Sequence, residues 1–218
     1  KKKVGVSAAL AGLPPLRSRL SKEPDSQEAW MKALREAPQT LKGWRVPLRN
    51  VIEAAMEKFI KRAEKQNTVG STFIPMEVVP GEAMPKDLRD WYLDTKVGGV
   101  LQHETRSHMR SDLHRYRFAA CFSATQKYAP NLGNFPPKLL PDHVNVDDET
   151  IPFKDRFRVQ MGKHPASTVV AHIKKDGHYY IHPDPAQCRS LTVREAARLQ
   201  TFPDNYFFEG NRTEQYGQ

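Results

Sequence analysis

The sequence has no long hydrophobic segment and little cysteine. None of its apolar runs reaches the roughly 18 residues that a membrane-spanning helix needs, so no transmembrane helix is expected. The two cysteines, Cys121 and Cys188, cannot form a disulfide framework and are typical of a protein from a reducing compartment. The chain begins basic and then turns apolar, as a signal peptide does, but Pro14 and Pro15 interrupt the apolar stretch before any cleavage site.

Phosphate-binding loops and metal-binding motifs are also missing. Gly98 and Gly99 stand alone and do not form a glycine-rich phosphate loop. His103 and His108 look like a zinc-protease pair, but they are five residues apart rather than four. On a helix this spacing places them about 140° apart, so they cannot face one ion. We therefore expect no metal site.

Positive charge is what the sequence has in excess. Its 34 Lys and Arg residues outnumber 25 Asp and Glu residues, which gives a net charge of +9 and a pI near 9.6. Such an excess attracts polyanions, and nucleic acid is the first candidate partner, although a merely soluble basic protein explains the charge equally well. Hydrophobic residues make up 39% of the chain and 17 prolines exceed 12 glycines, which predicts a core with many stiff connections.

Hydrophobic periodicity predicts a mainly helical first part. The expected helices cover residues 25–37, 48–65, 85–94 and 103–127. Asp25 and Ser26 are suitable caps for the first of them. In the second, apolar residues recur at helical spacing at positions 51, 52, 55, 56, 59 and 60. Residues 129–156 contain five prolines and are expected to be mostly loop.

The expected helix 103–127 carries a row of arginines. Its core positions would be Met109, Leu113, Tyr116 and Ala120. Arg106, Arg110 and Arg117 would fall within about 40° of one another beside that apolar face, where they could lie along a phosphate backbone. A solvated or carboxylate-paired edge gives the same pattern and, for this feature alone, is the favoured interpretation.

Short β-rich runs follow at 157–160, 168–173 and 178–182. Asp176-Gly177 is a typical hairpin turn and predicts that the last two runs pair, with Lys174 and Lys175 just before the turn. Thr192 then caps a helix to Thr201, with Glu195 at the capping-box position. The inward residues of that helix would be Ala196, Ala197, Leu199 and Gln200. The sequence thus predicts an α+β fold, in which a mainly helical region precedes a small β-hairpin that leads into a helix.

The most informative string runs from Arg189 to Asp204 and reads Arg-Ser-Leu-Thr-Val-Arg-Glu-Ala-Ala-Arg-Leu-Gln-Thr-Phe-Pro-Asp. With the runs that precede it, this string resembles the ninth conserved motif of DNA cytosine-5 methyltransferases. The match covers residues 157–217, and Tyr216-Gly217 resembles the approach to the family's tenth motif. The resemblance implies the C-terminal part of a bacterial enzyme with double-stranded DNA as its partner, a cytoplasmic location and a role in restriction–modification.

The resemblance also implies candidate DNA contacts. Thr168 matches a family position that meets the DNA backbone near the target nucleotide. Arg189, Arg194 and Arg198 are either phosphate contacts or buried pairs that organise the domain, and Glu195 is an obvious partner for them. The full set of candidate DNA-binding residues is Thr168, Arg189, Arg194, Arg198, Arg106, Arg110, Arg117, Lys174 and Lys175.

Three regions follow from the resemblance. Residues 1–16 look like the start of the family's variable region, residues 17–156 would be the target recognition domain, and residues 157–218 would be the hairpin and the motif helix. The family's catalytic Pro-Cys pair is missing, because Ala120 precedes Cys121 and Gln187 precedes Cys188. The glycine-rich cofactor loop is missing as well.

We therefore expect no catalytic residue and no bound cofactor in this chain. The resemblance implies S-adenosylmethionine for the intact enzyme and a catalytic domain in the same chain or in a separate subunit. Two alternatives stay open. Besides the recognition part of a methyltransferase, the chain could be the small subunit of a naturally split methyltransferase, or a non-catalytic DNA-binding module that keeps the recognition fold.

Overall fold

The computed structural model describes residues 3–79, 81–141, 156–175 and 177–218. Within them the α-helices are α1 (Val6–Leu10), α2 (Gln27–Glu36), α3 (Leu48–Ala63), α4 (Lys86–Tyr92), α5 (Arg110–Gln126), α6 (Val193–Leu199) and α7 (Arg212–Gln215). The strands are β1 (Arg19–Leu20), β2 (Gly70–Pro75), β3 (Gly99–Glu104) and β4 (Ser107–His108). Short 3-10 turns are η1 (Ala37–Leu41), η2 (Thr95–Val97), η3 (Leu132–Asn134), η4 (Pro137–Leu139) and η5 (Ala171–Lys174). The fold is α+β, as the sequence predicts.

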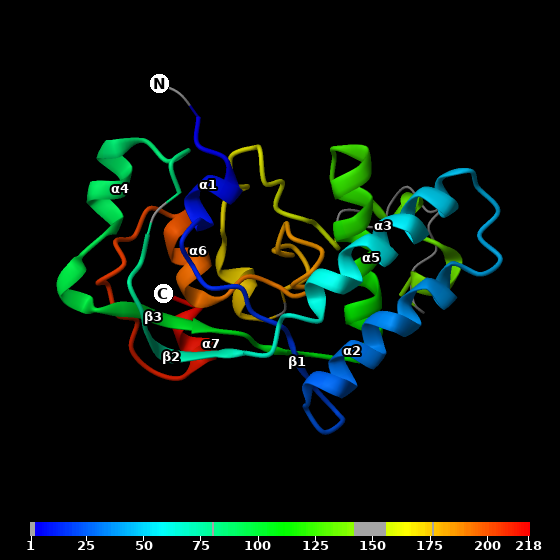
Figure 1. Cartoon of the computed structure of the whole chain (residues 1–218), viewed down its shortest axis with the longest axis horizontal. Helices are drawn as coiled ribbons and strands as arrows, with labels where there is room; N and C mark the ends of the chain where they lie inside the picture. The colour runs from blue at the N-terminus through cyan, green and yellow to red at the C-terminus, as the bar shows by residue number, and fades with distance from the viewer. Residues whose placement is uncertain (1–2, 80, 142–155, 176) are drawn as a thin grey trace.

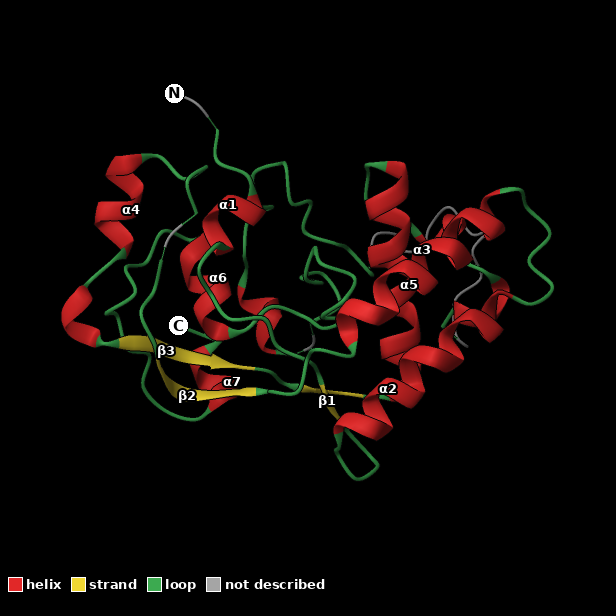
Figure 2. Ribbon diagram, in the orientation of Figure 1, coloured by secondary structure: helices red, strands yellow, loops and turns green. Residues whose placement is uncertain are grey.

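Two hydrophobic clusters divide the molecule. The first joins α2, α3 and α5 through residues such as Trp30, Leu34, Ile52, Met56 and Phe122, and we call this part the helical lobe. The second gathers around α6 and includes Val6, Leu10, Ala196, Ala197 and Tyr216; we call it the α6 lobe. Figures 1 and 2 show the two lobes side by side along the longest axis, with the β2–β3 pair and α4 at the far end of the α6 lobe. None of the described helices is long and apolar enough to cross a bilayer.

Two small sheets connect these parts. β2 and β3 pair antiparallel, from Gly70 opposite Glu104 to Pro75 opposite Gly99. Gly70 has φ of 77°, and a Cβ there would lie 1.9 Å from a backbone oxygen of β3, so only glycine fits this end of the pair. β1 and β4 pair in parallel and hold the chain just before α2 against the chain just before α5.

The first helices agree closely with the sequence prediction. The Ser26 side chain accepts a hydrogen bond from the Ala29 backbone N–H and caps α2. In α3, Ile52, Ala55 and Met56 are buried, whereas Val51 is 47% exposed and lies off the apolar face on which it was predicted. Pro85 precedes α4, as expected.

The predicted helix 103–127 is wrong at its start. Residues up to Glu104 belong to β3, and α5 begins only at Arg110, with Met109 as its N-cap. The β2 backbone takes the hydrogen bonds of β3, and the buried His103 ring lies against the Pro14 carbonyl and the Thr192 hydroxyl. Met109 is therefore 37% exposed, while the other predicted core positions, Leu113, Tyr116 and Ala120, are buried.

The predicted hairpin is also wrong. The runs 157–160 and 178–182 do pair, but with each other and in parallel, through a bridge between Val159 and Ile181. A second bridge joins Ile181 to Ser190 in antiparallel sense. The run 168–173 contains no strand, because the Tyr180 hydroxyl takes up two of its backbone groups and the chain then closes into η5. Asp176 of the expected turn lies outside the described residues.

Helix α6 starts as predicted. The Thr192 hydroxyl accepts from the Glu195 N–H, and the Glu195 carboxylate accepts from the Thr192 N–H, which makes a capping box. Ala196 and Ala197 are buried, but Gln200 is exposed rather than inward, because the helix ends at Leu199. Six of its seven residues are buried, so α6 is the centre of its lobe rather than a surface helix.

Candidate nucleic-acid interface

A cationic stretch of chain connects the two lobes. Residues 156–175 contain five Lys or Arg and two His but no Asp or Glu. Within it Lys163, His164, Thr168, Lys174 and Lys175 are exposed. We call residues 163–175 the basic segment; it is drawn in yellow in Figure 1. An exposed stretch of chain that carries cations and no carboxylate contributes positive potential, which favours binding of a polyanion.

Two buried polar side chains hold the basic segment. The Gln160 amide donates to the Ser167 hydroxyl and the Tyr179 carbonyl, and its oxygen accepts from the Ser167 N–H. The Tyr180 hydroxyl donates to the Thr168 carbonyl and accepts from the Val170 N–H. The buried Tyr180 hydroxyl thus fixes the backbone of Thr168, while the Thr168 side chain is exposed. Thr168 is therefore a surface residue, and its contact with the DNA backbone stays a prediction.

Helix α1 fixes the beginning of the segment. The Val6 N–H donates to the His164 carbonyl and the Ser7 N–H donates to the Gly162 carbonyl, both at 2.9 Å. A Cβ on Gly162 would lie 2.3 Å from the Ser7 hydroxyl oxygen, closer than side chains approach one another. Glycine at this position thus leaves room for the Ser7 hydroxyl where the 162–164 backbone lies against α1.

This close approach gives a stability prediction. We expect Gly162→Ala to lower the free energy of unfolding by about 1–3 kcal/mol, because the added methyl overpacks the contact with Ser7. Adding Ser7→Ala should restore most of the loss, since the Cβ of residue 7 lies at an ordinary 3.5 Å. Urea unfolding of the two variants measures both effects. A double variant no more stable than the single one contradicts this account of the loop.

The predicted Arg106–Arg117 row does not form. Arg106 precedes α5, donates to the Ile173 carbonyl and lies 4.1 Å from the centre of the Tyr216 ring. Its hydrogen bond holds the backbone of the basic segment at Ile173. Arg110 is paired with Glu23 and Glu36, and the hydrogen bonds that it donates to Glu23 raise its pKa above the ordinary value. Arg117 is 1% exposed and donates to the Met56 carbonyl. The carboxylate-paired interpretation holds for Arg110, and burial keeps Arg117 from any phosphate.

Arg189 is a buried organiser. It is 1% exposed and makes a two-pronged ion pair with Glu195, both bonds at 2.7 Å. Its remaining N–H groups donate to the carbonyls of Leu16 and Ser190 and to the Gln187 amide oxygen. Every guanidinium nitrogen is thus engaged inside the protein, which fits the structural alternative rather than a phosphate contact.

Arg194 and Arg198 are also buried, at 0% and 1% exposure. Arg194 donates to the carbonyls of Leu101, Pro203 and Tyr206, and burial among these neutral acceptors lowers its pKa to about 10. Arg198 pairs with Asp204 through two bonds and donates to the carbonyls of Ala9 and Ala11. These two residues fasten distant segments to α6 and present no donor to DNA.

Two histidines flank the Arg189–Glu195 pair. The His182 Nε2 lies 3.5 Å from the Glu195 carboxylate, and burial followed by the charge of Arg189 lowers its pKa to about 4. Burial likewise lowers the pKa of His103 to about 4. Glu195 itself is kept ionised, because the charge and hydrogen bonds of Arg189 outweigh burial and lower its pKa below the usual range. The pair is therefore charged while the histidines around it are neutral.

Nucleophilic and metal chemistry find no support in the described residues. Cys121 and Cys188 are both buried, and burial raises the pKa of each thiol to about 12, so neither forms a reactive thiolate near neutral pH. The described part of the chain also contains no group of three His, Cys, Asp or Glu residues that could hold a metal ion.

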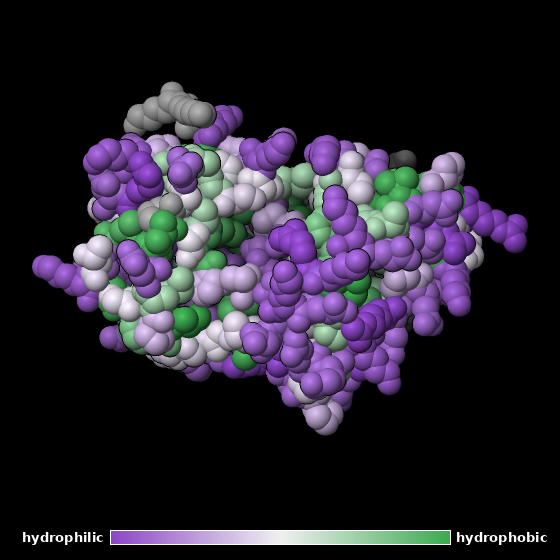
Figure 3. Space-filling model, in the orientation of Figure 1, coloured by the Kyte–Doolittle hydropathy of each residue, from purple (hydrophilic) through white to green (hydrophobic). Residues whose placement is uncertain are grey.

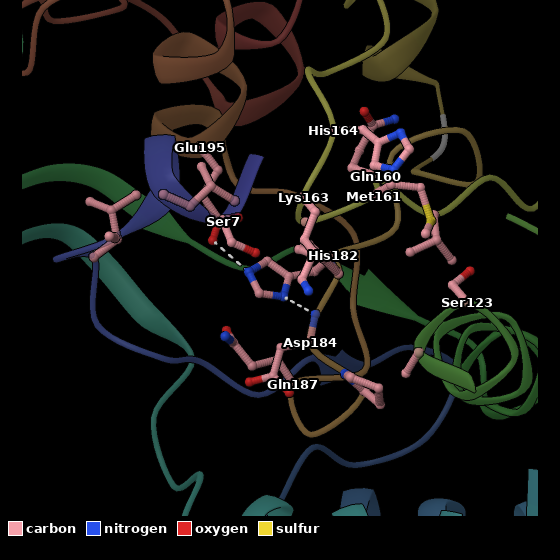
Figure 4. Close-up of a pocket in the computed structure, with 18 of the residues that line it drawn as sticks. Ser7, Ser123, Gln160, Met161, Lys163, His164, His182, Asp184, Gln187 and Glu195 are labelled. Atoms are coloured by element: carbon pink, nitrogen blue, oxygen red, sulfur yellow. Dashed lines mark hydrogen bonds and ion pairs between the residues drawn. The ribbon is translucent and has the colours of Figure 1, made fainter. Parts of the chain in front are cut away.

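The sequence prediction missed a cavity between the lobes. It has a volume of about 510 Å³ and is lined by α1, by the ends of α3 and α5, and by residues 159–164 and 182–187. Arg62, Lys127 and Lys163 are exposed residues of its lining, and Figure 4 shows Lys163 and His182 in the same part of it. The absence of Asp and Glu from residues 156–175 is a signal in the sequence that could have singled out Lys163. Arg62 and Lys127 are distant in sequence and come close to Lys163 only in the folded chain. Figure 3 shows hydrophilic side chains predominating over the α2–α3 end of the surface.

Comparison with known proteins identifies the chain. A family model described as C-5 cytosine-specific DNA methylase matches residues 41–218. The chain belongs to this family. Its relatives include the type II methyltransferase M.Bpa9945I of Bacillus paralicheniformis, 61% identical over 79 residues, which are 36% of this chain and 18% of that protein. The type II methyltransferase M.AgeI of Thalassovita gelatinovora is 41% identical over 66 residues, 30% of this chain and 15% of its own.

A plant relative is similar over a shorter stretch. The DNA (cytosine-5)-methyltransferase CMT2 of Oryza sativa is 62% identical over 34 residues, 16% of this chain and 3% of that protein. The C-5 cytosine methylase chain described here thus spans less than a fifth of the length of the relatives it matches. No solved structure matches it.

Proposed function

We propose that this chain supplies target-DNA recognition to a cytosine-5 methyltransferase, and that the basic segment contacts the DNA backbone. The observation that carries the proposal is the exposed, carboxylate-free stretch held by the lobe around the buried helix α6. Lys163, Lys174 and Lys175 would neutralise phosphates, and the Thr168 hydroxyl would donate to one of them. Arg106 is a positioning residue, because its hydrogen bond to the Ile173 carbonyl holds the backbone of the segment.

The remaining predicted arginines have another role in this proposal. Arg189, Arg194 and Arg198 hold the segment's scaffold together from the interior, and Arg110 and Arg117 stabilise the helical lobe. Rigid support of this kind matters for recognition, because phosphate contacts set the register in which any base-reading group meets the duplex.

S-adenosylmethionine is the methyl donor that the family implies. The lining of the inter-lobe cavity does not fit it. The carboxylates that line the inter-lobe cavity, Asp184 and Glu195, are engaged by Arg62 and Arg189, so neither is free to accept from the ribose hydroxyls of the cofactor. We derive no step through it and propose that the catalytic and cofactor-binding parts lie in another region of the protein or in a partner subunit.

The test is the salt dependence of DNA binding. We expect the triple variant Lys163→Gln, Lys174→Gln and Lys175→Gln to bind duplex DNA more weakly, with the slope of log K against log salt reduced by about three, since each phosphate contact contributes about 0.9. A control that removes the same charge elsewhere is Lys32→Gln, Lys42→Gln and Lys86→Gln, all exposed residues outside the segment. Fluorescence anisotropy over a salt series measures both slopes. Equal losses in the two variants would contradict a contact surface at the segment.

The same titration separates the alternatives. A preference for one duplex sequence over others supports a target recognition domain, whereas affinity that is independent of sequence favours a non-catalytic DNA-binding module. Co-purification with a second chain that carries the catalytic motifs would indicate the split enzyme.

A further inference from the structure

Helix α7 lies directly against the basic segment. It contacts η5, the 3-10 turn that forms the last part of that segment and includes Lys174. Just after α7, a Cβ added to Gly217 would lie 3.6 Å from the Lys174 Cδ atom, which is an ordinary van der Waals distance. The support of the basic segment thus includes a part of the chain that is far from it in the sequence.

The ring of Tyr216, at the end of α7, is fixed by the interior of the α6 lobe. Tyr216 is 6% exposed and belongs to the hydrophobic cluster around α6. Its hydroxyl donates a hydrogen bond of 2.7 Å to the Leu191 carbonyl, just before α6 begins. Packing and this hydrogen bond together hold the ring in one orientation.

Arg106 lies between this ring and the basic segment. The carbon atom of its guanidinium group is 4.1 Å from the centre of the Tyr216 ring. One of its N–H groups donates to the Ile173 carbonyl of η5 at 2.8 Å. A cation is attracted to the face of an aromatic ring, and more strongly where water is excluded. The buried ring therefore holds the guanidinium, and the guanidinium holds the η5 backbone.

Helix α7 also holds the backbone next to Arg106. The Arg212 side chain donates to the carbonyl of Thr105, which is buried and immediately precedes Arg106. The Asn211 side chain accepts from the Thr213 and Glu214 N–H groups and fixes the start of α7. Arg106 is thus held at its backbone through Arg212 and at its guanidinium through Tyr216.

We infer that Tyr216 is a positioning residue for DNA binding: through Arg106 it fixes the η5 backbone and so holds Lys174 and Lys175 where they meet phosphates. This inference rests on the proposed contact of the basic segment with DNA and adds a coupling between α7 and that contact. Coupling between two sites is reciprocal, so DNA bound at the basic segment stabilises α7 in turn.

The salt dependence of duplex binding separates positioning from a direct contact. Burial raises the pKa of the Tyr216 hydroxyl, so this side chain is uncharged at neutral pH and releases no counterion itself. We expect Tyr216→Leu, which removes the ring, to weaken duplex binding and to reduce the slope of log K against log salt by about two. Each of Lys174 and Lys175 contributes about 0.9 to that slope. A slope equal to that of the unaltered chain overturns the inference.

Two further variants separate positioning from a general loss of stability. Phe208→Leu removes another buried ring of the same cluster, one that packs against Phe202 and Tyr206. Tyr216→Phe keeps the ring beneath Arg106 and loses only the hydrogen bond to the Leu191 carbonyl. Both should be less stable towards urea and yet keep the slope, measured by fluorescence anisotropy where every variant is folded. A slope reduced equally in Phe208→Leu overturns the inference, because loss of packing alone would then explain it.

Amide hydrogen exchange tests the reciprocal effect on the unaltered chain. A short DNA duplex should slow exchange in residues 212–217 as well as in residues 170–175, while α4, at the far end of the α6 lobe, should exchange as before. In Lys174→Gln with Lys175→Gln, the duplex should no longer slow exchange in residues 212–217. Slower exchange at η5 without any change at α7 contradicts the coupling, and this measurement does not depend on the folding of a Tyr216 variant.

Failure of this inference is distinguishable from failure of the proposed function. If the triple lysine variant loses its salt slope and Tyr216→Leu does not, the proposed function stands and only the positioning role fails. If the chain binds no duplex, or the triple lysine variant keeps its slope, the proposed contact fails and the inference fails with it.

Discussion

The folded chain is expected to lose on the order of 5 kcal/mol of stability between pH 7.5 and pH 4.5 through two histidines. His103 and His182 are neutral in the fold because burial lowers the pKa of each from 6.5 to about 4. Between these two values the unfolded chain binds protons that the folded chain does not. Stability is therefore complete above pH 6.5 and decreases as the pH falls towards 4, by about 2.5 kcal/mol per histidine at pH 4.5.

Glu195 acts in the same direction at lower pH. Its pKa is lowered below the ordinary 4.5 because the charge and hydrogen bonds of Arg189 outweigh burial. A carboxyl of this kind contributes stability above pH 4.5 and loses it as the pH falls further. As the pH falls, the two histidines are protonated first, in the unfolded chain, and Glu195 of the Arg189 pair is protonated at lower pH. Both protonation steps favour unfolding.

Urea unfolding at pH 7.5, 6.0, 5.0 and 4.5 measures this dependence. The two protons that His103 and His182 take up on unfolding give a slope of about 2.7 kcal/mol per pH unit over the middle of the range. Burial also lowers the pKa of His108 and of His114, so these two residues make the slope steeper. The double variant His164→Gln and His172→Gln, which replaces exposed histidines, is the control and should keep the slope. A free energy of unfolding that is constant from pH 7.5 to 5.0 would falsify the neutral, buried state of His103 and His182.

The second large effect belongs to Glu195→Gln. This substitution should lower the free energy of unfolding by about 3–5 kcal/mol, because it leaves the charge of Arg189 buried without a partner. Glutamine can still accept from the Thr192 N–H, so the capping box is largely kept and the loss reports on the charge. The matched control is Glu64→Gln, which breaks the exposed pair with Arg35 and should cost less than about 1 kcal/mol.

A double variant separates charge from packing. Arg189→Met with Glu195→Leu removes both charges and fills the same space with apolar atoms, so it should be more stable than Glu195→Gln alone. Chemical denaturation of the three variants gives the comparison. If the double variant is less stable than the single one, the hydrogen bonds of Arg189 to Leu16 and Gln187 matter more than the buried charge.

Local signals made the helices predictable. Ser26 at the start of α2 and the Thr192–Glu195 capping box of α6 are decided by residues within four positions of each other, and both were confirmed. The structural role of Arg189 with Glu195 was one of two alternatives in the sequence, and their spacing of six residues made the pair reasonable. Features that depend only on residues close together in the sequence, such as helix caps, can be predicted from the sequence alone.

Distant partners explain the failures. The 103–108 stretch has helical periodicity, but β3 pairs with β2 and His103 reaches Thr192, 89 positions away. The segment 168–173 has strand-like composition, but the Tyr180 hydroxyl occupies its backbone. The inter-lobe cavity depends on Arg62, Lys127 and Lys163 meeting in space, which no spacing in the sequence indicates.

The central place of α6 has a consequence for how the protein is made. Its side chains bind carbonyls of Ala9, Ala11 and Leu101, which precede it by about 90 to 190 positions. A ribosome builds these earlier segments first, and their apolar faces stay exposed until residues 193–199 emerge. Contacts of such long separation form slowly, and unfinished chains of this kind aggregate readily. Production of this protein should therefore depend on chaperones and improve when translation is slow or the temperature is low.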